Sequence, residues 1–169
     1  MRWIWFFIIL FIVTLVNAST LMDAAAIGSL NIKPDLLLIM LVFFAINCET
    51  SDAILCSFAI GFAADISGSS MTMGPHIISF GIMGSALSFL RRSVIMRNLI
   101  YQGLCIFIVG LVSGMMAEGM IYSKLSGYSA NSFITVALSS IYSAIIGPVI
   151  WLGFTAMFRL LVPNQPKSA

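Results

Sequence analysis

Long apolar runs separated by short polar breaks dominate this chain. A membrane core about 30 Å thick is crossed by about 20 apolar residues of helix. The runs therefore predict an all-α integral membrane protein, a compact bundle of about six transmembrane helices in a single domain over residues 1–162. The predicted spans are residues 3–22, 34–48, 53–66, 75–90, 98–117 and 133–158, followed by a short tail at 163–169. The second and third spans are short, so we expect other helices to shield their polar ends.

The first apolar run has two interpretations. Arg2, the run behind it and the small residues around Ala18 fit a signal peptide with a cleavage site. The run also continues to Met22, which provides the length of an uncleaved first span. We favour the uncleaved span, because the rest of the chain also reads as a series of membrane helices.

Prolines mark two of the predicted helix starts. We expect Pro34 at the first helical position of the second span, with Asp35 one residue further in, facing the positive end of the helix dipole. Pro75 opens the fourth span in the same way. Gly147 and Pro148 lie within the sixth span and predict a kink there.

Composition and charge support a membrane location. The chain is 60% hydrophobic and 8% charged, whereas soluble proteins carry about 25% charged residues. A net charge of +2 is too small to indicate a nucleic-acid partner. Basic residues mark the cytoplasmic side of a membrane protein, and six spans with a cytoplasmic N-terminus place six of the eight there, so both termini are predicted to be cytoplasmic. The six are Arg2, Arg91, Arg92, Arg97, Arg159 and Lys167, against Lys33 and Lys124 outside.

Few side chains in the sequence carry chemistry. Four carboxylates fall at predicted helix ends, where caps or interfacial partners of lysine and arginine are the favoured interpretation. The alternatives are a structural carboxylate that holds the turn at 65–74 in shape for a partner protein, and a proton or ion site. The four carboxylates are Glu49, Asp52, Asp65 and Glu118. His76 is the only histidine, and the three cysteines have no close pairing, so no metal site or disulfide framework is indicated. No catalytic motif is present either, and we expect a protein that is not an enzyme and has no cofactor.

Small residues four positions apart recur along the predicted helices. Such pairs let helix backbones approach closely in lipid, either within one bundle or against a partner's helix. The candidate pairs are Gly81 with Ser85, Gly110 with Gly114, Ser57 with Gly61, and Ser140 with Ala144.

Three stretches together resemble the bacterial rod shape-determining family MreD. They are Pro34-Asp35-Leu36-Leu37-Leu38, Gly61-Phe62-Ala63-Ala64-Asp65-Ile66-Ser67-Gly68-Ser69 with Met73-Gly74 soon after, and Phe89-Leu90-Arg91-Arg92. The resemblance implies a component of the bacterial inner membrane that acts in cell-wall elongation without being an enzyme. Its implied partners are the single-span protein MreC, the filament protein MreB, the glycosyltransferase RodA and the elongation transpeptidase. The family fold is similar to the six-helix substrate-binding subunits of energy-coupling-factor vitamin transporters.

The sequence supports two functional hypotheses of different classes. In the first, the chain is a scaffold that binds MreC, and a set of residues shapes its outward-facing helix ends. That set is Pro34, Asp35, Gly61, Asp65, Gly68 and Gly74. In the second, the chain is the binding subunit of a small-molecule transporter, with a polar pocket lined by Asp35, Asp65, His76 and Glu118. An ion-coupled transporter is less favoured, because Pro34 and Pro75 begin helices and do not interrupt them.

Overall fold

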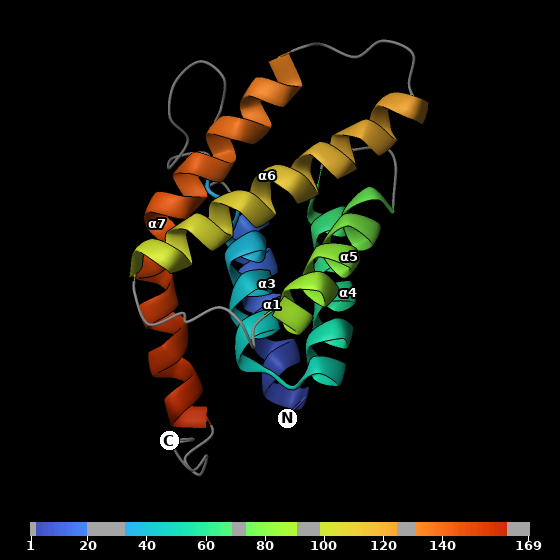
Figure 1. Cartoon of the computed structure of the whole chain (residues 1–169). Helices are drawn as coiled ribbons and strands as arrows, with labels where there is room; N and C mark the ends of the chain where they lie inside the picture. Colours follow the sequence, from blue (N-terminus) through green and yellow to red (C-terminus); the bar gives the residue numbers. More distant parts are fainter. Residues whose placement is uncertain (1–2, 20–32, 69–73, 91–98, 125–130, 162–169) are drawn as a thin grey trace.

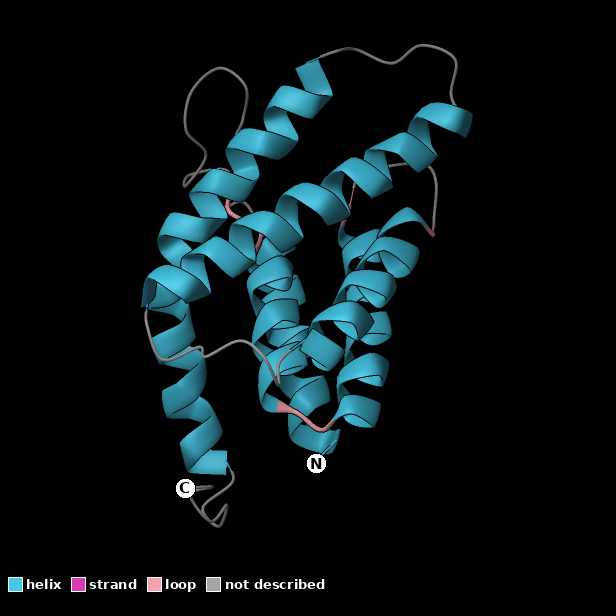
Figure 2. Cartoon of the chain, viewed as in Figure 1, coloured by secondary structure: helices cyan, strands magenta, loops and turns pink. Residues whose placement is uncertain are grey.

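The structure is a computed structural model that describes residues 3–19, 33–68, 74–90, 99–124 and 131–161. Every regular element in these ranges is an α-helix, which confirms the predicted all-α class (Figures 1 and 2). The helices are α1 (Trp3–Ala18), α3 (Leu36–Asn47), α4 (Thr50–Ser67), α5 (Pro75–Leu90), α6 (Leu99–Lys124) and α7 (Asn131–Leu161). The basic cluster at 91–97, the tail at 163–169 and residues 20–22 of the predicted first span lie outside the described residues.

Three of these helices are long and apolar enough to cross a membrane. The segments that qualify are Thr50–Ser67, Ile100–Ser123 and Phe133–Thr155, and the helices α1, α3 and α5 are apolar but shorter. Large apolar side chains are exposed at helical spacing on the outside of the bundle, for example Ile141, Ile145 and Val149 on α7. Soluble proteins rarely leave such continuous apolar surfaces uncovered. The described part of the chain is thus compatible with a helical membrane protein, with three helices of membrane length where six spans are predicted.

Helix α3 lies at the centre of the bundle. Each side chain from Leu37 to Ala45 is at most 3% exposed, and α3 contacts every other described helix. A helix that is apolar on all sides is stable when protein surrounds it. Because the other helices enclose α3, this helix can be too short to cross a membrane. This agrees with the expectation that its neighbours shield it.

Four of the other helices form two antiparallel pairs around α3, and α1 packs against α3 and α4. Helix α4 packs along α5, and α6 packs along α7, with α6 crossing the bundle obliquely (Figure 1). Successive helices run in opposite directions, so the starts of α3 and α5 and the end of α4 lie together at what we call the upper end. The start of α1 and the end of α7 lie at the opposite, lower end.

Two helix boundaries differ from the prediction in ways that matter for the site. Helix α3 begins at Leu36 and Asp35 is its N-cap, so Pro34 precedes the helix and is not its first residue. Helix α6 continues to Lys124, past the predicted end at residue 117, and Glu118 lies within a helix instead of at its end. A glycine such as Gly119 costs a helix only about 1 kcal/mol, which the apolar residues after it offset.

The remaining boundaries agree more closely. Helix α5 begins and ends at the residues predicted for the fourth span. Helix α4 starts at Thr50, before the predicted residue 53, and ends at Ser67. Helix α7 runs without a break through Pro148, and the kink predicted there stays a prediction.

The central position of α3 predicts how the bundle responds to truncation of its side chains. Leu41 is fully buried, whereas Leu152 on α7 is 62% exposed. We expect Leu41→Ala to lower the free energy of unfolding by about 2 kcal/mol or more, because it leaves a cavity. Leu152→Ala is the matched control and should leave the thermal midpoint, measured by circular dichroism in detergent, unchanged. Equal midpoints for the two variants would contradict a central α3.

Candidate functional site

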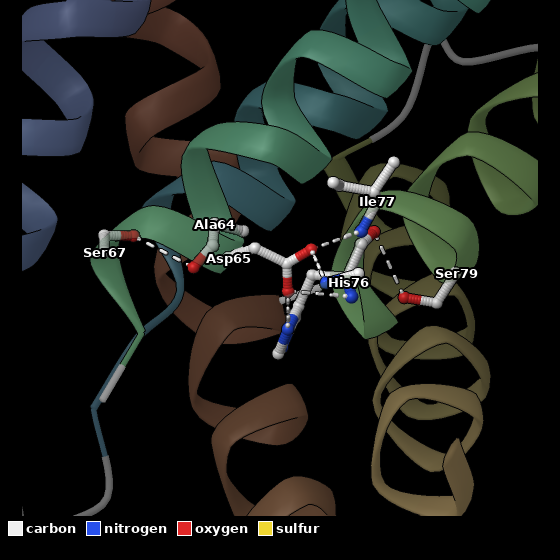
Figure 3. Close-up of polar contacts among 7 residues, drawn as sticks. Ala64, Asp65, Ser67, His76, Ile77 and Ser79 are labelled. Atoms are coloured by element: carbon white, nitrogen blue, oxygen red, sulfur yellow. Dashed lines mark hydrogen bonds and ion pairs between the residues drawn. The ribbon is translucent and has the colours of Figure 1, made fainter. Parts of the chain in front are cut away.

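The carboxylate of Asp65 joins the end of α4 to the start of α5 (Figure 3). Its side chain is 1% exposed. Oδ2 accepts hydrogen bonds from the backbone N–H groups of Gly74 at 2.9 Å and Ile77 at 3.1 Å, and Oδ1 accepts one from the N–H of His76 at 3.1 Å. The first N–H groups of a helix have no partner within that helix, and its N-terminus attracts negative charge. Asp65 therefore caps a helix other than its own.

The same carboxylate also holds the ring of His76. Nδ1 lies 3.1 Å from Oδ1 of Asp65, and the ring packs edge-on against Phe80 with a centroid distance of 5.8 Å. Because Oδ1 can only accept, the hydrogen bond assigns the ring proton to Nδ1 and leaves the lone pair of a neutral ring on Nε2. The sequence groups His76 with Asp65 only as candidate pocket residues and does not predict the hydrogen bond between them. The available signal was an aspartate at one helix end and a histidine directly after the proline that starts the next helix.

Gly61 and Gly74 provide the space and backbone conformation that this arrangement needs. Gly61 lies one turn before Asp65, and a Cβ atom there would be 2.7 Å from the carbonyl oxygen of His76 and 2.8 Å from Cα of Ile77. The backbones of α4 and α5 are thus in direct contact at this point. Gly74 has a φ of +118°, which favours glycine. We call Gly61, Asp65, Gly74, His76 and Ile77 the α4–α5 clasp.

The other residues of the predicted shaping set lie near the clasp without belonging to it. Gly68 is the exposed C-cap of α4, and its φ of −73° is open to any residue. Pro34 is buried. Asp35 caps α3 by accepting from the N–H groups of Leu37 at 3.0 Å and Leu38 at 3.2 Å.

Two serines of α7 hold the start of α3 in place. The backbone N–H of Asp35 donates to Oγ of Ser143 at 2.9 Å, and Oγ of Ser139 donates to the carbonyl oxygen of Lys33 at 2.8 Å. These serines lie one helical turn apart, so they present their hydroxyls on one face. Neither was singled out from the sequence, where serines are too common to be informative.

A cavity of about 280 Å³ opens at the upper end between α3, α5, α6 and α7. Three of the four residues predicted for a pocket line it, namely Asp35, His76 and Glu118. Asp65 is not among the lining residues and reaches the cavity only through His76. Hydroxyl groups make up much of the remaining polar lining, from Ser113, Thr135, Ser139 and Ser140.

Each predicted small-residue pair has at least one member at a contact between helices, and the contacting helices differ. Gly110 faces Leu38 and Ser140, and Gly114 faces Val136, so these glycines allow α6 to approach α3 and α7. They also line the cavity.

In the pair on α5, Gly81 contacts another helix and Ser85 makes its hydrogen bond within α5. Gly81 meets the ring of Phe58, while the hydroxyl of Ser85 donates to the carbonyl oxygen of Gly81 in its own helix at 2.6 Å. A further close contact joins Gly84 to Ser57 and was not expected from the sequence.

The chain has no match among protein-family models, curated proteins or solved structures. Within the described ranges, no three histidine, cysteine, aspartate or glutamate residues are placed to hold a metal ion. The functional features of the upper end are therefore a buried carboxylate that caps a neighbouring helix and, beside it, a small polar cavity.

Removal of the Asp65 carboxylate should destabilise the bundle. In Asp65→Ala the backbone N–H groups of Gly74, His76 and Ile77 lose their acceptor, and each buried unpaired group costs about 1–3 kcal/mol. We expect a loss of at least about 2 kcal/mol in the free energy of unfolding, and a smaller loss for Asp65→Asn, which keeps one acceptor oxygen. Glu49→Ala removes an exposed carboxylate that caps nothing with its side chain and should leave the midpoint unchanged. An Asp65→Ala protein as stable as the wild type would contradict the clasp.

Gly61→Ala tests the backbone contact separately. The added methyl group would overlap the first turn of α5, and overpacking of this kind costs about 1–3 kcal/mol. Gly153→Ala on α7 is the control, because nothing lies within 4 Å of a Cβ atom there. Thermal unfolding should show a lower midpoint for Gly61→Ala and no decrease for Gly153→Ala.

Proposed function

We propose that the chain is a non-catalytic inner-membrane scaffold of the bacterial cell-wall elongation complex, of the MreD kind. Its main partner would be an MreC-like protein, and through it the scaffold would work beside MreB, RodA and the elongation transpeptidase. The observation that carries this proposal is that Asp65 holds the start of α5 against the end of α4. Asp65 lies in the Gly61–Gly74 stretch, which carries part of the family resemblance. Its carboxylate makes four hydrogen bonds, to the first turn of α5 and to Gly74 directly before it.

A residue used in this way supports a role in shape. Its oxygens are occupied by the start of α5, so little of its chemistry is available to a substrate. What the clasp provides is a defined surface at the upper end, and a preorganised surface lowers the entropic cost of binding a partner. This is the property that a scaffold needs.

The proposal includes six membrane crossings with both termini in the cytoplasm. Supporting it, the described helices alternate in direction, and the start of α1 and the end of α7 share the lower end (Figure 1). In the sequence the arginine-rich stretch at 91–97 follows α5 and precedes α6, and by the positive-inside rule the lower end would be cytoplasmic. The upper end would then face the periplasm. Similarity to the energy-coupling-factor binding subunits is part of the same proposal and rests on the family resemblance.

A second candidate function is the small-molecule binding subunit of a membrane transporter. The cavity at the upper end favours it, because polar groups from four helices converge there. Mass spectrometry of the purified protein separates the two functions: a stoichiometric metabolite retained through purification supports the binding subunit.

Co-purification with the MreC-like partner tests the scaffold. Asp65→Ala should reduce the amount of partner recovered and produce rounded cells, because the upper end loses its shape. Gly68→Leu should reduce recovery without lowering the thermal midpoint, since Gly68 is exposed at the same end and its backbone accepts any residue. Glu49→Ala at the lower end is the control. Normal recovery and normal rods for both variants, at normal protein level, would overturn the scaffold proposal.

A further inference from the structure

The cavity at the upper end has a lining that suits a small cation. Two carboxylate residues reach it from different helices, Asp35 from the start of α3 and Glu118 from within α6. No lysine or arginine is among the described residues that line it. Both carboxylate residues are partly exposed, and a cleft whose charged side chains share one sign attracts ions of the opposite sign. We propose that this cavity binds a small ligand through a primary ammonium group.

The polar groups of the cavity are held in position by residues behind them. Asp35 is fixed by its own helix and by Ser143. His76 is held by Asp65 through Nδ1, so Nε2 is the ring nitrogen that remains for a ligand, and it is an acceptor when the ring is neutral. A site whose side chains are already positioned loses little entropy when a ligand enters.

An ammonium group matches this lining better than the other ligand classes do. It carries three N–H donors and no acceptor, whereas the cavity offers carboxylate, imidazole and hydroxyl acceptors. An anion would be repelled by the carboxylates of Asp35 and Glu118. A metal ion would need several ligands gathered at one point, and no such group occurs among the described side chains.

The size of the cavity limits the rest of the ligand. Its volume of about 280 Å³ lies at the lower end of the range of about 300–1,000 Å³ for ligand pockets. Leu38, Phe80 and Val136 form an apolar part of the wall that can contact methylene groups. A short aliphatic amine therefore fits, either as a free metabolite or as the ethanolamine headgroup of a lipid.

An amine site is compatible with both candidate functions and depends on neither. In a scaffold, binding of an amine or an amine-bearing lipid at this site would stabilise the shape of the upper end. In a binding subunit, the amine would be the cargo. Partner recovery by co-purification and amine binding are measured separately, so failure of one proposal is distinguishable from failure of the other.

The test is binding of two amines to the full-length protein in detergent, each compared with its uncharged analogue. Putrescine and ethanolamine should raise the thermal midpoint in a saturable way, while 1,4-butanediol and ethylene glycol should not. Glu118→Gln should weaken amine binding by about 10-fold or more, the size expected for loss of a charge-assisted hydrogen bond. Glu49→Gln makes the same substitution at an exposed position of the lower end and should bind as the wild type does.

A second arm distinguishes the source of the ammonium group. In nanodiscs, a higher midpoint with phosphatidylethanolamine than with phosphatidylcholine, lost in Glu118→Gln, would identify the lipid headgroup as the ligand. Should Glu118→Gln fail to fold, Thr135→Val keeps both carboxylates, replaces a lining hydroxyl with a methyl group, and should also weaken binding. Absence of any response to putrescine, ethanolamine and phosphatidylethanolamine overturns the proposal, as does unchanged binding in the folded variants.

Discussion

The upper end of the bundle depends on one carboxylate that satisfies the start of a neighbouring helix. Unpaired N–H groups are costly wherever water is excluded, and most costly in a membrane interior. By accepting from Gly74, His76 and Ile77, Asp65 removes this cost for α5 and also determines where α5 begins relative to the end of α4. Gly61 adds the close backbone contact one turn away. Capping and packing therefore act on the same two helices at the same point.

A second set of hydrogen bonds fixes the start of α3 on the other side of the cavity. Ser139 and Ser143 attach residues 33–35 to α7, while the α4–α5 clasp holds His76. The cavity lies between these two attachments, so the parts of its wall that come from the starts of α3 and α5 are held in place. The body of α3 below it is packed on all sides, and this core supports both attachments.

Residues from two of the three stretches that resemble the MreD family, Asp35 and Asp65, lie at the same end as the cavity. Asp35 lines the cavity itself, and Asp65 reaches the cavity through His76. A change in the clasp would therefore shift His76 in the cavity wall, and a ligand in the cavity would contact a side chain that the clasp positions. This shared location is the physical reason that a partner-binding role and a ligand-binding role are compatible in one molecule.

The lengths of the apolar runs and the prolines between them were enough to predict an all-helical membrane-type bundle and the bounds of α5. Those properties depend on local chain chemistry, which a sequence displays directly. Burial is different: α3 is almost wholly enclosed while α7 is largely exposed, although both are apolar, because hydrophobicity does not distinguish a lipid-facing surface from a protein core. The hydrogen bond between Asp65 and His76 and the anchoring serines of α7 likewise come from contacts between separate helices. Only the packing of the helices decided them.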